Sequence, residues 1–421
     1  MANHKRKRRN KDTYKLIVVA IFLAIIIIVF HKAPNYVLDL IPKQTIRLIY
    51  NTDDLTLGLA KQIIRDEKED IYIAVEDIRK IWDENIYYDE QNEQIVTSTD
   101  KKLATMKKGE KIVTVNSSKV ETYGTLLEIE GTYYLPILEF QDIYNIDVQY
   151  IEKTNTVTID YLEERYLVAR AKKNIGVKLL KDSNSRSVDK VHKGESIILD
   201  IKQDLNEDWL KVRTQNGKVG YVKNKQISNI STLRDELTAE KQIAGDVYLF
   251  IDEFASPANA PDRTGEPLDQ KVNAVAPTLF RIQKSNDSNL RTNIGNAGTN
   301  YISWAHNQEY RVWPMITNYQ MEETTENLLN DYALREKLIN DIVSAILKYD
   351  LDGITLRFES VQNSQNLIKF VSELSPRLKE IGKVFVFDKT KVGDIPMERI
   401  EKEVDYIIQD SYEESKLITL K

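Results

Sequence analysis

The sequence predicts a multidomain chain with an N-terminal transmembrane helix, a small α+β repeat domain, an all-β domain and a C-terminal domain of alternating strands and helices. Three observations predict this organisation. An apolar run follows a basic N-terminus, a pattern of apolar residues recurs after 62 positions, and strand-like and helix-like patterns alternate from about residue 243 onward. A length of 421 residues is enough for two to four domains.

The composition excludes several classes of chemistry. The chain has no Cys, which rules out disulfides, thiolate metal sites and Cys nucleophiles. Its four His are scattered, and none of them has the spacing of a metal-binding pair. We therefore expect neither a metal ion nor another cofactor.

The N-terminus is predicted to anchor the chain in the cell membrane. Residues 1–15 carry a net charge of +6, against −6 for the whole chain, and the apolar run from Leu16 to Phe30 follows directly. The positive-inside rule makes residues 1–15 a cytoplasmic basic tail, 16–31 a single-pass signal anchor and 32–43 an external stalk. A cleaved signal peptide is the alternative, but His31-Lys-Ala33 lacks a small-x-small cleavage site. The acidic remainder of the chain argues against a nucleic-acid partner.

Residues 44–163 contain the repeat. Each copy reads as a short strand, an amphipathic helix and a hairpin, which turns at 90–93 in the first copy and at 152–155 in the second. The matched pairs are Tyr72/Tyr134, Val75/Ile137, Ile78/Phe140, Ile81/Ile143, Trp82/Tyr144, Tyr88/Tyr150 and Ile95/Val157. The stretch from Tyr133 to Ile159 resembles the copper amine oxidase N-terminal-like domain. Residues 44–163 hold no His or Cys to bind copper, so we expect a wall-facing spacer or a binding unit with an unknown ligand.

Short alternating strands predict an all-β domain over residues 170–228. Asn216-Gly217 predicts a hairpin with a type I′ turn, in which both central residues have positive φ. The stretch from Asp208 to Val222 resembles the bacterial SH3 pattern W-x-x-V-x-x-x-x-G-x-x-G-[WY]-V, a family whose members commonly bind peptidoglycan peptides. Trp209 and Tyr221 are expected in the core, and residues 229–242 are expected to be a helical linker.

Residues 243–421 alternate strands with helices, as a (β/α) TIM-like barrel requires. In the fourth predicted strand, Ile354, Leu356 and Phe358 point to one side, while Thr355, Arg357 and Glu359 point to the other. The six predicted strands cover residues 246–251, 272–277, 310–316, 352–359, 384–388 and 405–412. Because residues i and i+2 of a strand share a face, we expect Arg357 beside Glu359, where its charge favours a carboxylate without a proton.

This fourth strand resembles the signature of glycoside hydrolase family 18, D-G-x-D-x-D-[FWY]-E. Asp352 and Glu359 match, whereas Thr355 and Arg357 replace the other two Asp residues. The resemblance implies a (β/α)8 barrel that cleaves N-acetylglucosamine linkages in peptidoglycan or chitin-like glycan. Glu359 would be the acid, and the substrate's own acetamido group, held by the replaced Asp, would be the nucleophile. Tyr412 matches the Tyr of the family's M-x-Y-D element, which contacts that group.

Two departures from the family bear on activity. A cation replaces a carboxylate at residue 357, although a general acid must hold a proton. Only nine residues follow Tyr412, so we expect strands seven and eight to be missing and two sheet edges to be exposed, unless a protein partner closes the gap. Three hypotheses remain: a glycan-binding wall protein with weak or no hydrolysis, an active glycosidase, or a scaffold that binds other proteins.

Overall fold

The computed structural model describes residues 42, 44–162, 166–234, 246–265, 268, 271–284, 289–319, 321–409 and 416–420. The expected basic tail and signal anchor lie outside these residues. Among the residues described, no helix is long and apolar enough to span a bilayer. The described residues form two compact units: one holds those up to 72 together with those from 144 to 234, and the other holds those from 73 to 143 together with those from 246 onward.

The predicted repeat is confirmed. The first copy consists of β4 (Ile71–Ala74), α2 (Val75–Ile81), β5 (Tyr87–Asp89) and β6 (Gln94–Ser98). The second consists of β11 (Thr132–Pro136), the 3-10 helix η2 (Ile137–Phe140), α3 (Gln141–Tyr144), β12 (Ile146–Ile151), the 3-10 helix η3 (Glu152–Thr154) and β13 (Thr156–Tyr161). Glu93 and Asn155, which are 62 positions apart, both adopt a left-handed backbone at the hairpin turn, with φ of 47° and 49°.

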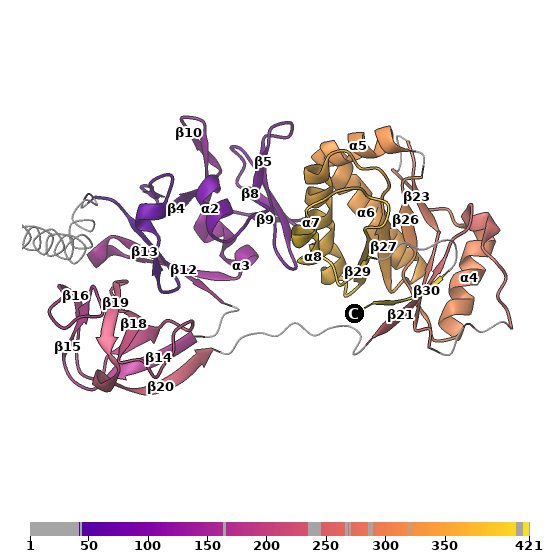
Figure 1. Cartoon of the computed structure of the whole chain (residues 1–421). Coiled ribbons are helices and arrows are strands. Elements are labelled where there is room, and N and C mark those ends of the chain that lie inside the picture. Colours follow the sequence, from indigo (N-terminus) through magenta and orange to yellow (C-terminus); the bar gives the residue numbers. More distant parts are fainter. Residues whose placement is uncertain are drawn as a thin grey trace, which may run out of the picture. The chain divides into compact units, whose positions relative to one another are not determined.

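Unit 1 contains two sheets (Figure 1). The first has the order β12-β13-β1-β2, in which β1 (Arg47–Tyr50) runs parallel to β13 and β2 (Asp53–Asp54) pairs antiparallel with β1. The second is antiparallel, with the order β16-β15-β19-β18-β17-β14-β20, and confirms an all-β region. Its strands are β14 (Tyr166–Ala171), β15 (Ile175–Lys178), β16 (Ser187–Val191), β17 (Ser196–Leu199), β18 (Trp209–Arg213), β19 (Val219–Lys223) and β20 (Ile227–Arg234).

Three expectations for this second sheet are wrong. Ile227–Arg234 is a strand rather than part of a helical linker, because it pairs with β14 and this tertiary pairing outweighs local propensity. The hairpin between β18 and β19 forms, but of Asn216-Gly217 only Gly217 has positive φ, at 69°. The Gly217 N–H donates to the Thr214 carbonyl over 2.9 Å, so the turn is not type I′. Trp209 and Tyr221 are half-buried rather than in the core.

The N-terminal part of unit 2 is mostly β-structure. One sheet has the order β5-β6-β7-β8-β9, with β7 (Leu103–Lys107), β8 (Ile112–Val115) and β9 (Ser118–Glu121) joined as antiparallel neighbours. A hairpin pairs β10 (Leu127–Ile129) with β11. The hairpin of the first repeat copy, β5 and β6, therefore forms the start of this sheet.

The C-terminal part of unit 2 is an α/β region whose six predicted strands are all found in order. They are β21 (Val247–Asp252), β22 (Ala274–Pro277) with β23 (Phe280–Ile282), β25 (Arg311–Val312) with β26 (Met315–Thr317), β27 (Gly353–Arg357), β28 (Val384–Asp388) and β29 (Tyr406–Ile408). These strands pair in parallel, and β24 (Leu290–Arg291) pairs antiparallel at the edge of β23. The helices are α4 (Gly295–Asn307), α5 (Glu322–Asn330), α6 (Tyr332–Tyr349), α7 (Ser364–Glu380) and α8 (Met397–Glu401).

The two faces of these strands bury different cores. Ile354, Leu356 and Phe358 pack with apolar residues of the helices, as predicted from the alternation. The opposite face buries an inner core, whose members are Val247, Leu249, Ile251, Ala274, Ala276, Trp313, Met315, Val384, Val386, Tyr406 and Ile408. The side chains of the inner face fill the interior, as in a barrel.

The six-stranded region was expected to expose both of its edges. This expectation is wrong at β21, whose free edge is covered by another strand. The strand β30 (Lys416–Leu420) pairs antiparallel with β21, from Val247 opposite Leu420 to Ile251 opposite Lys416. Sequence alternation predicted only parallel strands, and a short antiparallel strand at an edge gives no separate periodic signal. Pairing of this kind satisfies backbone groups that an edge strand leaves open.

Candidate functional site

The inner face of the strands becomes polar at their carboxyl ends. Each of five residues lies two positions beyond a buried residue of the inner face, and therefore shares its face. These residues, which we call the polar ring, are Glu253, Thr278, Thr317, Arg357 and Asp388. In α/β barrels the carboxyl ends of the strands carry the functional residues.

Arg357 is the central residue of the polar ring. One terminal nitrogen pairs with Glu253, the other lies 3.5 Å from a Glu359 carboxylate oxygen, and Nε lies 3.9 Å from Asp388 Oδ2. The prediction that Arg357 lies beside Glu359 is confirmed. Glu253 and Asp388 were not predicted to belong to the site. Asp388 ends one predicted strand and Glu253 follows another by two residues, and this position was the signal that could have identified them.

Burial differs strongly within this cluster. The side chains of Arg357 and Asp388 are 9% and 0% exposed, whereas those of Glu253 and Glu359 are 31% and 29% exposed. Buried charges are costly unless they are paired, so Arg357 and Asp388 depend on their neighbours. The two exposed carboxylates remain accessible from solvent.

The backbone of Glu359 is fixed by Asn318, which follows β26. Glu359 N–H donates to Asn318 Oδ1 over 2.7 Å, and Asn318 Nδ2 donates to the Glu359 carbonyl over 3.1 Å. Asn318 is itself buried. These two hydrogen bonds position the backbone of Glu359 without using its carboxylate. The pattern of apolar and polar residues did not predict the contact between Asn318 and Glu359.

Thr355 is not available to a ligand. Its side chain is fully buried, and its hydroxyl donates to the Trp313 carbonyl over 3.0 Å. The residue lies one layer below the polar ring, beside Met315 in the ladder. A hydroxyl that already bonds the backbone in the interior does not replace a carboxylate that holds a substrate.

Asp352 is not brought to the polar ring. Asp352 precedes β27 and lies at its amino end, where its Oδ2 accepts from Val312 N–H over 2.9 Å and lies 3.2 Å from His306 Nε2. It therefore ties the end of α4 to β25. Tyr412 lies outside the described residues, as does the rest of 410–415.

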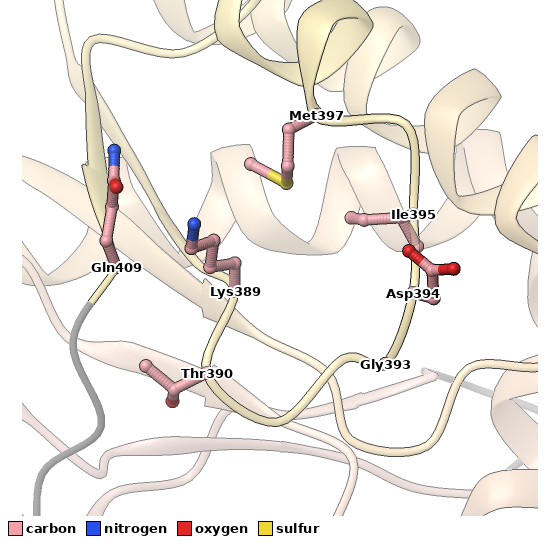
Figure 2. A pocket seen from close by; sticks show the side chains of 7 residues that line it. All are labelled: Lys389, Thr390, Gly393, Asp394, Ile395, Met397 and Gln409. Carbon is pink, nitrogen blue, oxygen red and sulfur yellow. The ribbon is translucent and has the colours of Figure 1, made fainter.

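A cavity of about 560 Å³ is lined by residues that follow β28 and β29 (Figure 2). Its lining residues are Lys389, Thr390, Gly393, Asp394, Ile395, Met397 and Gln409. Thr390 joins this cavity to the ring, because its hydroxyl and its N–H donate to Asp388 Oδ1 over 2.6 and 2.9 Å. The cavity has the size of a small-ligand pocket.

The arrangement favours binding of a polar ligand. Over the described part of the chain, no group of three His, Asp or Glu side chains is placed to hold a metal ion. The cluster instead offers exposed carboxylates, hydroxyls and one buried guanidinium, which are hydrogen-bonding partners for a sugar.

The comparisons with known proteins identify two parts of the chain. Residues 54–159 match the family model of the copper amine oxidase N-terminal domain. The C-terminal region is similar in fold to a class V chitinase from Pseudomonas fluorescens Pf-5, with 19% identity and a TM-score of 0.32 over 38% of this chain and 52% of that one. It is also similar to a putative chitinase domain from Desulfitobacterium hafniense DCB-2, with 21% identity and a TM-score of 0.31 over 38% of this chain and 53% of that one.

A third similar structure is a putative sporulation-specific glycosylase, ydhD, from Bacillus subtilis, with 20% identity and a TM-score of 0.25 over 30% of this chain and 46% of that one. The chain thus spans about half the length of the structures it matches. No curated protein matches it. Residues 54–159 thus match a copper amine oxidase N-terminal domain, and the C-terminal α/β region has a distant similarity in fold to chitinase structures.

Proposed function

We propose that this chain is a membrane-anchored, extracytoplasmic wall protein that binds N-acetylglucosamine-containing glycan, with weak or no hydrolysis. The observation that carries the proposal is Arg357, a buried cation paired with Glu253 at a position where the family-18 motif has an Asp. A guanidinium only donates hydrogen bonds, so it does not accept the N–H of a substrate acetamido group. The mechanism of the family depends on orienting that group.

The polar groups at the carboxyl ends of the strands support glycan binding. The polar ring, the adjoining cavity and the partly exposed Glu359 together present many hydrogen-bonding groups at the barrel mouth. The predicted signal anchor at 16–31 and the SH3-like pattern within 170–228 support a location at the wall, since they predict a membrane tether and a peptidoglycan-binding module.

An active glycosidase is the second candidate, and one observation favours it. Glu359, the residue that matches the family's acid, is retained, is 29% exposed and has its backbone fixed by Asn318. A positioned and accessible carboxylate is a requirement for general acid catalysis. Hydrolysis would then have to proceed without either of the replaced Asp residues.

The test measures binding and turnover on the full chain, purified in detergent. Cosedimentation with purified cell wall reports binding, and release of reducing ends from chitooligosaccharide and from peptidoglycan reports hydrolysis. We expect cosedimentation without release. Release by the natural chain that is abolished by Glu359→Gln would establish the glycosidase instead.

Two further outcomes sharpen this test. Arg357→Asp restores one motif carboxylate, and a gain of release in this variant would show that residue 357 is what suppresses hydrolysis. Failure to sediment with any wall preparation would contradict glycan binding and would favour a scaffold that binds proteins.

A further inference from the structure

Resting on the glycan-binding function proposed above, we infer that the polar ring takes a sugar unit with a free ammonium group, such as a de-N-acetylated glucosamine residue, in contact with Glu359. The reasons are the unbalanced charge of the cluster, the open hydrogen-bonding capacity of Glu359 and two buried hydroxyls without partners.

The first observation is an excess of negative charge. Three carboxylates, from Glu253, Glu359 and Asp388, surround one guanidinium. Arg357 pairs closely with Glu253, whereas its separations of 3.5 Å from Glu359 and 3.9 Å from Asp388 are longer than hydrogen bonds. Among the described residues, Glu359 therefore has no cation at hydrogen-bond distance.

A second guanidinium reduces this excess, because Arg281 is the register partner of Thr317 and lies on the same face. Three carboxylates against the two guanidinium groups still leave one negative charge, and two other cations nearby do not pair with the three carboxylates. Arg263 is engaged by Asp252, with Nη2 at 2.8 Å from Oδ2, and Asp252 is not a member of the polar ring. Lys389 points into the adjoining cavity (Figure 2). Over the described residues, it forms no ion pair with the three carboxylates.

The second observation is that the carboxylate of Glu359 is open. Asp388 receives two hydrogen bonds from Thr390, but the side chain of Glu359 receives none from the described residues. It is 29% exposed while its backbone is held by Asn318. A fixed carboxylate with unused acceptor oxygens binds donors from a ligand.

The third observation is independent of charge. Thr278 and Thr317 are each 6% exposed, and among the described residues neither hydroxyl has a hydrogen-bond partner. Thr317 is the register partner of Arg357, and both lie on the inner face. Buried polar groups are normally satisfied, so these hydroxyls indicate a missing polar ligand or an ordered water.

An ammonium fits these groups better than an acetamido group does. It has three donors and a positive charge, which match an open carboxylate and neighbouring hydroxyl oxygens. An acetamido group is neutral, offers one N–H and adds a methyl group that would lie among charged side chains. The charge of the cluster thus selects the deacetylated sugar.

The experiment compares two ligands on the full chain in detergent. Isothermal titration at about pH 6 measures the affinity for a glucosamine tetramer and for an N-acetylglucosamine tetramer, in about 20 mM and about 500 mM salt. We expect the glucosamine tetramer to bind at least tenfold more tightly, with most of this preference lost at high salt. Glu359→Gln should remove the preference, and Thr317→Val should reduce it several-fold.

Controls separate the possible failures. Glu309→Gln removes one exposed carboxylate at the amino end of β25, remote from the polar ring, and should leave the preference unchanged. Equal binding of both tetramers, or tighter binding of the acetylated one, would overturn the inference while leaving the glycan-binding function intact. Binding of neither would overturn both. If a simple amine such as ethylammonium displaced the tetramer at similar concentration, the selected group would be the amine alone and not a sugar.

Discussion

Unit 2 contains two arginine–carboxylate clusters that differ in how completely their hydrogen bonds are satisfied. Arg335 of α6 bonds both oxygens of Glu373 on α7, over 2.8 and 3.0 Å, and also the Tyr87 hydroxyl at 2.6 Å and the Leu329 carbonyl at 2.7 Å. Arg357 in the polar ring has one close carboxylate and two at 3.5 and 3.9 Å. The carboxylate of Glu373 receives three hydrogen bonds, so we call the first cluster closed. The carboxylate of Glu359 receives none from the described residues, so we call the second cluster open.

The closed cluster joins two parts of the sequence. Tyr87 belongs to the copper amine oxidase N-terminal domain, and its hydroxyl donates to Glu373 over 2.7 Å, so β5 packs against α6 and α7 within unit 2. Burial alone would lower the pKa of Arg335, but the charge of Glu373 and its hydrogen bond raise it above the usual range. Burial and Glu373 also raise the pKa of Tyr87, which keeps its proton. What separates a structural cluster from a binding site is therefore whether its carboxylates already accept hydrogen bonds, and not whether charge is present.

Breaking the closed cluster should have the largest effect on stability. Arg335→Met leaves Glu373 buried without a counter-charge, since both side chains are 2% exposed or less. We expect a loss of about 3–5 kcal/mol, measured by chemical denaturation followed by helix and aromatic signals. Lys348→Met, on an exposed position of the same helix, is the control, and a similar loss for both would contradict a special role for the cluster.

Removing only the hydroxyl of Tyr87 should lower the free energy of unfolding by less than Arg335→Met does. Tyr87→Phe retains the ring but deletes the bonds to Arg335 and Glu373, which are to charged groups. We expect a loss of about 1.5–3 kcal/mol in the same denaturation measurement. An unchanged free energy of unfolding would mean that Arg335 and Glu373 satisfy each other's hydrogen bonds without the Tyr87 hydroxyl.

Neutralising the close partner of Arg357 should affect binding more than stability. Glu253→Gln removes the charge that pairs with the guanidinium, which can then approach Glu359. The Glu253 side chain is 31% exposed, so solvent screens the lost interaction and the effect on stability is small. We expect about 1 kcal/mol of destabilisation and a several-fold fall in affinity for the glucosamine tetramer. Unchanged affinity would show that Arg357 does not compete for Glu359.

Two threonines on neighbouring inner strands provide a matched pair. Thr355→Val deletes a hydroxyl that donates to the Trp313 carbonyl, and should cost about 1 kcal/mol. Thr317→Val deletes a hydroxyl without a partner among the described residues, and should be close to neutral for stability. Thermal melts of both variants without ligand provide the comparison, and equal losses would show that the Thr317 hydroxyl is satisfied after all.

The smallest effect concerns pH. Burial raises the pKa of Glu403, which accepts from Asn85 Nδ2 over 2.9 Å. A carboxyl that binds its proton more tightly when folded makes the folded state less stable as pH rises from the unfolded to the folded pKa. Glu403→Gln should therefore flatten the fall in melting temperature between acidic and neutral pH. A steeper fall in the melting temperature of the variant would mean that Glu403 stabilises the folded state as pH rises, which is the opposite of the expected effect.

Much of the fold could be predicted because its signals are local. The 62-residue repeat and the inward and outward rows of β27 follow from periods of apolar residues, and both are confirmed. The partner of Arg357 could not be predicted, because Glu253 is 104 residues away and only the pairing of the strands brings them together. For the same reason the pairing of β30 with β21 and the burial of Arg335 gave no signal in the sequence. Asp352 matched a motif, yet its place before β27 puts it at the other end of the strand from Arg357.

A crystal structure of the chain with a glucosamine tetramer tests the open cluster most directly. We predict a sugar nitrogen within hydrogen-bond distance of the Glu359 carboxylate, with Arg357 still paired to Glu253 and the Thr317 hydroxyl bonded to the sugar. A tetramer bound elsewhere, with Arg357 closed onto Glu359 and both threonine hydroxyls bonded to ordered water, would contradict it.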